Sequence, residues 1–299
     1  MNSEVQCVVP AGDICGEGAV WSSEENALYW CDINRFLLHR YSASSHATES
    51  WLFDEPVVAV NLTTTPGLLL LVLATRIGFW SAATHPALTT IHTLPTAPPM
   101  RFNDAKVDPR GSLWVGTMRN NVGSGGENLE VDFTDGVLYR LDPDGSVSEW
   151  MEGIGISNTL AWSPDRSTFY FGDSIANVIY SFAFDRATGA IAARKPFFAG
   201  YEEGLPDGST MDAEGCLWNT RHFAGHLVRI CPDGSVDRTV VLPVSKPTTC
   251  AFGGHDLRTL FITSSRSHER LSGSLFSLST DIPGDPVGRF RHNGQAQRS

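Results

Sequence analysis

Five polar residues with the chemistry of metal ligands or of acid–base catalysts recur at similar positions along this chain. Glu17 lies in CGEGAVW, Asn103 and Asp104 in MRFNDAKVD, Asn158 in GISNTLAWS and Asp207 in GLPDGSTMD. Each of them stands just before or at the beginning of a predicted strand. Taken singly, each is an ordinary turn former. Their recurrence predicts that their side chains converge at one end of a common channel.

Such a convergence of carboxylates and amides needs a cation. Unpaired charges buried in a narrow, otherwise apolar channel are costly. Oxygen ligands of this kind suit a hard divalent ion such as calcium, magnesium or manganese, and carboxylates also accept zinc or iron. The sequence therefore predicts a site for one divalent cation, with calcium as the first choice.

The elements that position these residues form a sixfold repeat, in which a turn rich in Asp, Asn, Pro or Gly adjoins short apolar strands. The strand centres are about 42 to 56 residues apart. A repeat of this length built from hairpins indicates a four-stranded propeller blade, which must stack on its neighbours to bury its faces. The six phrases are GAVWSSEENALYWCDI from Gly18, GLLLLVLAT from Gly67, AKVDPRGSLWVGTM from Ala105, LAWSPDRSTFYFGDS from Leu160, TMDAEGCLWNTR from Thr210 and CAFGGHDLRTLFITSS from Cys250.

We therefore predict an all-β, six-bladed β-propeller that forms a single domain over residues 1–299. We find no amphipathic helix of convincing length. The N-terminal strand near Val5–Val9 is expected to complete the last blade as a clasp. The polar stretch 285–299 is expected to fray.

Composition limits the partners. The formal net charge of −11 argues against nucleic acid, because phosphate binding needs a clustered basic face. The N-terminus lacks a basic, apolar leader, and the longest apolar run, Leu68–Ala74, is too short to cross a membrane. The six cysteines include no CxxC pair, which favours reduced thiols. These features predict a cytoplasmic protein, a monomer or weak homodimer, that acts on a small molecule.

Two other motifs favour structural roles. His222 and His226 lie four residues apart, but in a predicted strand and turn this spacing does not place them on one face, and no HExxH motif is present. The stretch Gly123–Gly126 lacks the Lys-Ser/Thr of a phosphate-binding loop. It is expected to form a loop over the mouth of the channel.

The motifs GEGAVW, RFNDAKVDPRGSLWVGTM, GISNTLAWSPDRSTFYFGDS, GLPDGSTMD with AEGCLW, and PTTCAFGG with LFITSS resemble the SMP-30/gluconolactonase/LRE family. The similarity runs in order from about Asp13 to Ser265. It implies a six-bladed propeller that holds one divalent cation with Glu17, Asn158 and Asp207. By the same resemblance, Arg101 and Asn103 contact the substrate, and Asp104, the second acid of that motif, is expected to bind the substrate as well.

The chain also departs from the family pattern. Asn158-Thr159 stands where many members have Asn-Gly, Asn219-Thr220 replaces a Val-Ala pair, and Asn121 or Asn120 replaces a substrate-contacting acid. We assign Asn121 to substrate binding. The replacements predict a less negative and slightly narrower pocket, which favours a small neutral lactone with five carbons.

The resemblance and the residues together predict hydrolysis of a sugar lactone, a pentonolactone or hexonolactone, to the aldonic acid. Asp207 is the expected general base, and Arg101 is expected to neutralise charge on the tetrahedral intermediate or to hold a ring hydroxyl. Two alternatives share these ligands. One is a regucalcin-like calcium-binding regulatory protein, and the other is a different metal-dependent esterase.

Overall fold

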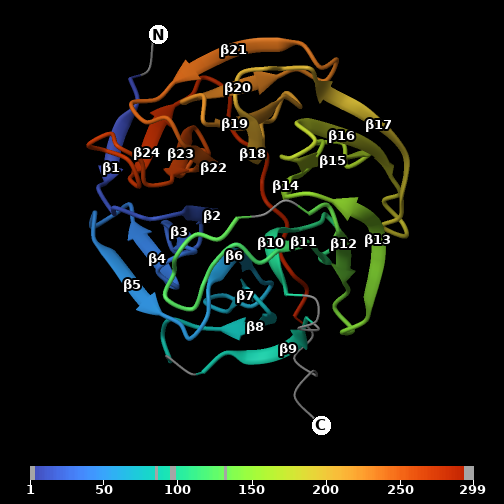
Figure 1. The fold of residues 1–299 in the computed structure, drawn as a ribbon, viewed down its shortest axis with the longest axis horizontal. Coiled ribbons are helices and arrows are strands. Elements are labelled where there is room, and N and C mark those ends of the chain that lie inside the picture. Colours follow the sequence, from blue (N-terminus) through green and yellow to red (C-terminus); the bar gives the residue numbers. More distant parts are fainter. Residues whose placement is uncertain (1–3, 85–86, 95–98, 131–132, 293–299) are drawn as a thin grey trace.

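The computed structural model describes residues 4–84, 87–94, 99–130 and 133–292. Six four-stranded antiparallel sheets surround a central axis, which confirms the predicted six-bladed propeller (Figure 1). Over the described ranges all 24 elements are strands. Within these residues, no helix has the length and apolar character needed to span a bilayer.

Each blade is a four-stranded meander whose first strand lines the channel, and we number the blades along the chain. Blades 1 to 3 contain β2 Gly16–Ser22, β3 Ala27–Asp32, β4 Leu37–Ser42 and β5 Thr48–Leu52; β6 Val57–Leu62, β7 Leu69–Leu73, β8 Arg76–Trp80 and β9 Thr89–Thr93; and β10 Met100–Val107, β11 Leu113–Arg119, β12 Gly136–Leu141 and β13 Val147–Ile154. Blades 4 to 6 contain β14 Ser157–Trp162, β15 Thr168–Asp173, β16 Val178–Phe184 and β17 Ile191–Ala199; β18 Leu205–Met211, β19 Leu217–His222, β20 His226–Ile230 and β21 Val236–Val241; and β22 Pro247–Gly253, β23 Thr259–Ser264, β24 Leu275–Ser279 and β1 Gln6–Val9.

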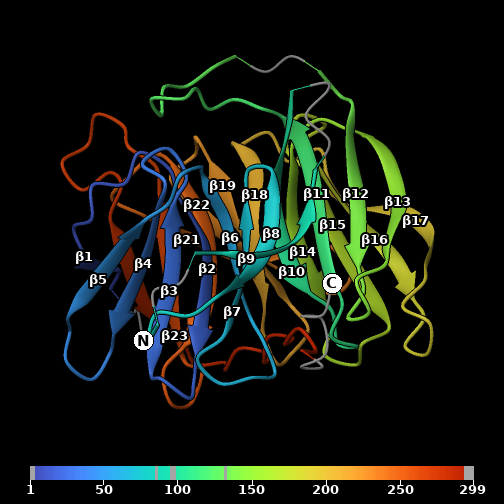
Figure 2. The ribbon, with the colours of Figure 1, turned by 90° about the horizontal axis from the view of Figure 1, so that it is seen from below.

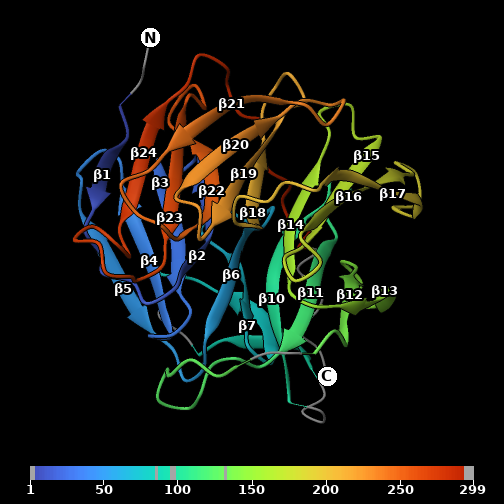
Figure 3. The same cartoon turned by 45° about the horizontal axis from the view of Figure 1, so that its top comes forward.

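The ring closes where the N-terminal strand joins the last blade. Strand β1 pairs antiparallel with β24, with Gln6 opposite Ser277 and Cys7 opposite Phe276. The two strands run side by side at the outer edge of blade 6 (Figure 3). The predicted clasp is therefore present in the structure.

Every channel-lining strand carries an irregularity near its beginning. The pairing register shifts between Glu17 and Val20 in β2, and between Asn158 and Leu160 in β14. The other four inner strands shift at matching places, at 57–59, 102–105, 206–209 and 247–250. A bulge bends a strand and re-aims its side chains. The bulges explain how polar residues at strand starts point into the channel while the rest of each strand continues the apolar ladder.

Aspartate-led turns fix the opposite ends of the inner strands. In the predicted turns at 108–111 and 212–215, the amide of the fourth residue donates to the carbonyl of the aspartate, at 3.0 Å for Gly111 and 3.1 Å for Gly215. Large aromatic side chains pack between neighbouring blades. The ring centroids of Trp114 in blade 3 and Phe169 in blade 4 are 5.2 Å apart. Burying a ring of this size contributes about 4–6 kcal/mol as an upper estimate.

The segment after β24 crosses the face opposite the β11–β12 loop (Figure 2). The amide of Asp285 donates to Met211 O at 2.9 Å, and Phe290 pairs with Thr63 and is buried. The expectation of a fraying tail from Asp285 is therefore wrong for residues 285–292, because Phe290 supplies an apolar anchor there. The remainder of that stretch, 293–299, lies outside the described residues.

Candidate active site

A cavity of about 340 Å³ opens at the mouth of the channel where the bulges lie. Blades 1, 3, 4, 5 and 6 contribute its walls. The polar and charged side chains that line it are Cys15, Glu17, Arg101, Asn103, Asn121, Asn128, Asn158, Ser174, Asp207, His222, Lys246, Thr248, Ser265 and Arg266. The sequence-predicted residues Glu17, Arg101, Asn103, Asn121, Asn158 and Asp207 are thus brought together.

The loop between β11 and β12 arches over this mouth (Figure 2). Asn34 of blade 1 holds it, since Asn34 Nδ2 donates to Gly126 O at 2.8 Å and to Asn128 Oδ1 at 3.0 Å. Gly126 has a φ of +83°, and a Cβ atom there would lie 2.1 Å from Asn34 O. Only glycine fits this contact. The predicted glycine-rich loop therefore lies over the channel and is fastened to blade 1, two blades away in the ring.

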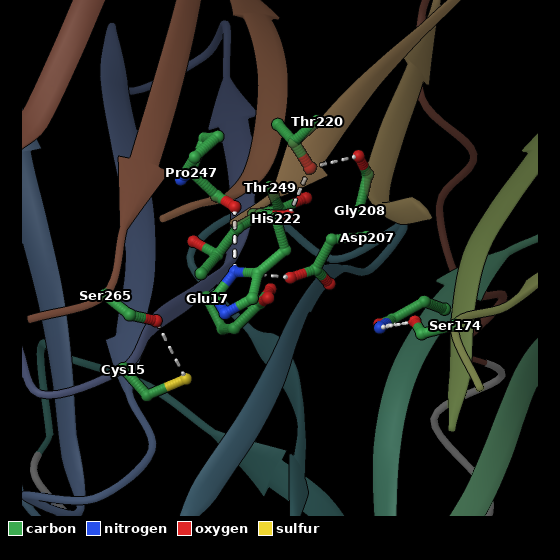
Figure 4. A network of polar contacts seen from close by, with 12 residues as sticks. Cys15, Glu17, Ser174, Asp207, Gly208, Thr220, His222, Pro247, Thr249 and Ser265 are labelled. Atoms are coloured by element: carbon green, nitrogen blue, oxygen red, sulfur yellow. Dashed lines mark hydrogen bonds and ion pairs between the residues drawn. The ribbon is translucent and has the colours of Figure 1, made fainter. Parts of the chain in front are cut away.

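Two carboxylates, Glu17 and Asp207, lie close together at the mouth of the channel (Figure 4). Burial raises the pKa of Glu17 to about 8, with a further contribution from the charge of Asp104. Burial and then the charge of Glu17 raise the pKa of Asp207 well above its usual range. No Lys or Arg within the described ranges forms an ion pair with either group. A divalent cation between them would remove this repulsion.

Asn158 adds a neutral oxygen to the two acids. Its Nδ2 donates to Ser174 Oγ at 2.9 Å, which fixes the amide so that Oδ1 is the free end. Asn103 Nδ2 donates to Ser157 O at 2.8 Å and makes a longer contact of 3.3 Å with Asn158 Oδ1. Asn158 Oδ1 consequently keeps capacity for one more partner.

Arg101 is buried beside the acids with only neutral hydrogen-bond acceptors. Asn121 Oδ1 accepts from Nε at 2.8 Å and from Nη2 at 2.6 Å, while Nη1 donates to Phe102 O at 2.8 Å and to Asn103 Oδ1 at 2.6 Å. Burial lowers the pKa of Arg101 to about 10, so the guanidinium stays charged at neutral pH. A guanidinium has five N–H donors, and these contacts engage four. One donor and the whole positive charge are available to a ligand.

The structure separates the two asparagines that the sequence left open. Asn121 points into the cavity and holds Arg101. Asn120 turns its side chain back onto the main chain, where its Nδ2 donates to Val122 O at 2.9 Å.

His222 is a member of the site that sequence reasoning missed. It ends β19, and its Nδ1 lies 3.4 Å from Asp207 Oδ2 and 3.1 Å from Pro247 O (Figure 4). Burial lowers the pKa of His222 to about 4, so the imidazole is neutral at pH 7. In the pairing of β19 with β18, His222 lies opposite Leu205, which is two residues before Asp207. This proximity can be inferred only when the register of the two strands is known. His226 points elsewhere, toward the Tyr201 hydroxyl at 3.0 Å.

Asp104 does not line this cavity. The bulge in β10 leaves Asn103 at the mouth and places Asp104 lower in the channel, in a small cavity that Lys106 also lines. Burial raises the pKa of Asp104, and the nearby Lys106 opposes that shift. The position of Asp104 therefore gives no support to the expected contact with the substrate. Its negative charge affects the site indirectly, because it helps to raise the pKa of Glu17.

Cys15 also lines the cavity, with its Sγ 3.5 Å from Ser265 Oγ (Figure 4). Burial, with the charge of Glu17, raises the pKa of this thiol far above neutrality. A protonated thiol is a poor nucleophile. The geometry therefore gives Cys15 no covalent role.

Thr159 and Asn219, two of the residues at which the chain departs from the family pattern, both contact the main chain of Asp207. Thr159 has a φ of +52°, a strained conformation for a β-branched residue. Its Oγ1 donates to Asp207 O at 2.5 Å, and Asn219 Nδ2 donates to the same carbonyl at 3.0 Å. Ser209 Oγ bonds both side chains at 2.9 Å. The two residues therefore fix one backbone group of Asp207.

The donor set fits a hard divalent cation. Over the described residues, no cluster of three or more His, Cys, Asp and Glu side chains has metal-binding geometry. An amide oxygen can complete such a set, and Asn158 presents one beside the two acids of raised pKa. Carboxylates completed by an amide oxygen suit calcium, magnesium or manganese better than softer ions.

The closed propeller thus presents two acids, an amide and an arginine at one mouth, a set of groups that could hold a cation and a polar ligand. The chain belongs to the SMP-30/gluconolactonase/LRE-like family, whose model matches residues 15–266. It is 34% identical over 296 residues to a 6-deoxy-6-sulfogluconolactonase of Pseudomonas putida, covering 95% of this chain and 97% of that one. It is 34% identical over 287 residues to a pentonolactonase of Haloferax volcanii, covering 92% and 94%. A solved structure described as the calcium-binding protein regucalcin of Agrobacterium tumefaciens superposes with a TM-score of 0.88 at 26% identity, covering 97% and 98%.

Proposed function

We propose that this protein hydrolyses a sugar lactone to the aldonic acid with the help of one divalent cation. The observation that carries this proposal is the pairing of Glu17 and Asp207, two acids of raised pKa, with the buried and unneutralised charge of Arg101. The 34% identity to two proteins named as sugar lactonases supports the same reaction.

Glu17, Asn158 and Asp207 would hold the cation, and we propose calcium as the ion. When bound, such an ion supplies Lewis acidity that polarises the lactone carbonyl. Three protein oxygens leave room for water and substrate around it. The cytoplasmic location and the monomeric or weakly dimeric state stay predictions from the sequence.

Asp207 is the proposed general base. Its carboxylate lines the cavity beside His222, where it can reach a water molecule that attacks the lactone carbonyl. It would take a proton from the attacking water. His222 lies beside this carboxylate, with its Nδ1 3.4 Å from Asp207 Oδ2, and Pro247 O at 3.1 Å is the nearer acceptor for the single Nδ1–H of the neutral imidazole.

Arg101 is the proposed electrostatic partner of the oxyanion. Asn121 and Asn103 hold its guanidinium rigidly through neutral oxygens, which leave its charge undiminished. A preorganised charge in a site of low dielectric stabilises a developing negative charge strongly. The amide groups of Asn103, Asn121 and Asn128 would hold the hydroxyl groups of the sugar.

The test combines metal analysis of the purified protein with a pH-stat assay on arabinono-, xylono-, galactono- and gluconolactone. We expect turnover that a chelator abolishes and that a divalent ion restores. Tight calcium binding with no turnover of any lactone would favour the regucalcin-like alternative. Turnover of simple esters in preference to every lactone would favour the esterase alternative.

A further inference from the structure

The cavity is positively charged in a protein that is strongly acidic. Acids outnumber bases 33 to 22 over the whole chain. The cavity reverses this balance, because Arg101, Lys246 and Arg266 line it against only two acids, Glu17 and Asp207. A divalent cation on the two acids would leave three positive charges facing the substrate.

Blade 6 places two of these bases at the rim. Lys246 directly precedes β22, and Arg266 lies two residues after β23. The main chain fixes both, since the amide of Ser265 donates to Lys246 O at 2.9 Å and the amide of Arg266 donates to Ile14 O at 3.0 Å. The rim bases therefore come from one rigid corner of the ring, next to blade 1.

The charges of the rim bases are not neutralised. Across the described residues, no carboxylate lies within 4.0 Å of Lys246 or Arg266. The half-buried ammonium of Lys246 lies over the ring of Phe223, 5.4 Å from its centroid, and its charge disfavours a proton on His222. Arg266 donates to a neutral acceptor, Gly12 O. Glu269 Oε1 accepts from the amide of Ser245 at 3.1 Å, whereas its Oε2 has no hydrogen-bond partner among the described residues and lies more than 4.0 Å from either rim base.

We propose that the lactone carries an anionic group, such as a carboxylate, phosphate or sulfonate, which Lys246 and Arg266 bind at the rim. This inference rests on the proposed function for the reaction at the base of the cavity. The reacting ester would lie beside Asp207 and Arg101, and the anionic group would lie at the opposite end of the substrate. It replaces the small neutral lactone expected from the sequence, because the loss of an acid at Asn121 and the two rim bases favour an anion.

The kinetic test compares an acidic lactone with its neutral counterpart. Glucarolactone and 6-phosphogluconolactone are measured against gluconolactone with one divalent ion at low ionic strength. We expect kcat/KM for an acidic lactone to exceed that for gluconolactone by roughly tenfold or more, and this preference to shrink in added salt. The two acidic substrates distinguish a carboxylate site from a phosphate site.

The variants are Lys246→Gln, Arg266→Gln and the pair, with Lys195→Gln as the matched control. Lys195 is exposed on β17 and makes the same charge change far from the cavity. We expect the pair to lower the ratio of acidic to neutral kcat/KM by about tenfold, and the control to leave it unchanged. A wild-type protein that prefers gluconolactone, or an unchanged ratio in the pair, would overturn the proposal.

A binding experiment separates this proposal from the proposed function. If no lactone is hydrolysed, the proposed function is wrong. Calorimetry with glucarate and gluconate, with and without the divalent ion, still tests whether Lys246 and Arg266 bind an anion. Tighter binding of glucarate that is lost in the paired variant would support the anion site. Equal binding of the two acids would reject it.

Discussion

Asp207 and Asp212 lie five residues apart at the two ends of one inner strand, and both are buried, yet their surroundings differ completely. At the end of this strand away from the cavity, which we call the closed end, the Asp212 carboxylate accepts from Trp218 Nε1 at 2.9 Å and from Arg229 Nε at 2.8 Å. It also accepts from the amides of Glu214 and Cys216 at 3.0 Å. At the open end, Asp207 faces another acid, and burial raises its pKa.

The difference distinguishes a carboxylate that stabilises a turn from one that is available to bind a ligand. Asp108 in blade 3 repeats the arrangement of Asp212, with Trp114 Nε1 at 3.0 Å and the amides of Arg110 and Ser112 at 2.8 and 3.0 Å. A carboxylate saturated with donors holds its turn and has no capacity for a ligand. A buried carboxylate without such donors is destabilising unless something outside the chain binds it.

The largest expected effect is on activity at the open end. Asp207→Asn, and separately Glu17→Gln, should lower kcat/KM by about a thousandfold or more and abolish metal binding, because each removes a charge that the cation and the reaction need. A pH-stat assay and metal analysis measure both. Near wild-type turnover in the presence of a chelator would show that the site lies elsewhere.

The same Asp207→Asn variant should not lose stability. Since burial raises the pKa of Asp207, the ionised form weakens the metal-free fold as pH rises above the unfolded value near 3.8. In chelator at pH 8 we expect a Tm equal to or above that of the wild-type protein, with the difference vanishing near pH 4. A lower Tm at pH 8 would contradict the comparison.

The next largest effect is on stability at the closed end. Asp212→Asn should lower the free energy of unfolding by about 3 kcal/mol, because Arg229 loses its buried partner. The measurement is urea denaturation in chelator. We expect the protein that remains folded to bind metal normally. Loss of metal binding with unchanged stability would show that Asp212 belongs to the site and does not stabilise the fold.

Arg101→Lys should have an intermediate effect. A lysine cannot reproduce the fork that contacts Asn121 and Asn103, so kcat/KM should fall about 10- to 100-fold while the metal content stays the same. Arg76→Lys is the matched control, because blade 2 contributes no residue to the cavity. Full activity in Arg101→Lys would show that the fork has no part in the reaction.

The smallest effect concerns the hydrogen bonds behind Asp207. Thr159→Gly and Asn219→Val each remove one donor from Asp207 O, and we expect a coupling of about 1 kcal/mol in the double-mutant cycle of unfolding free energies. We also expect kcat to fall more than KM rises, because the substrate contacts are untouched. Thr159→Ser retains the hydroxyl and serves as the control. Strictly additive effects would mean that the two residues act separately.

The repeated turns and apolar strands were sufficient to predict the propeller and its clasp, since each blade is a local pattern. They also indicated Glu17, Asn158 and Asp207, because these stand at equivalent strand starts. His222, Lys246 and Arg266 could not be found in this way. They reach the cavity from strand ends and loops, whose directions depend on register and on closure of the ring. The bulge in β10 likewise decides that Asn103, and not Asp104, lines the cavity.

The pairing of β1 with β24 has a consequence for how the protein is made. Residues Gln6–Val9 leave the ribosome long before their partner strand, which begins only at Leu275. Until then blade 6 lacks its two outer strands, so the joint between blades 1 and 6, where Trp21 stacks on Phe261 with ring centroids 5.6 Å apart, is held by an incomplete blade. A nascent chain can complete five blades and still expose that apolar joint to other chains. The interval before β24 has been made is therefore the period in which this protein is most open to aggregation.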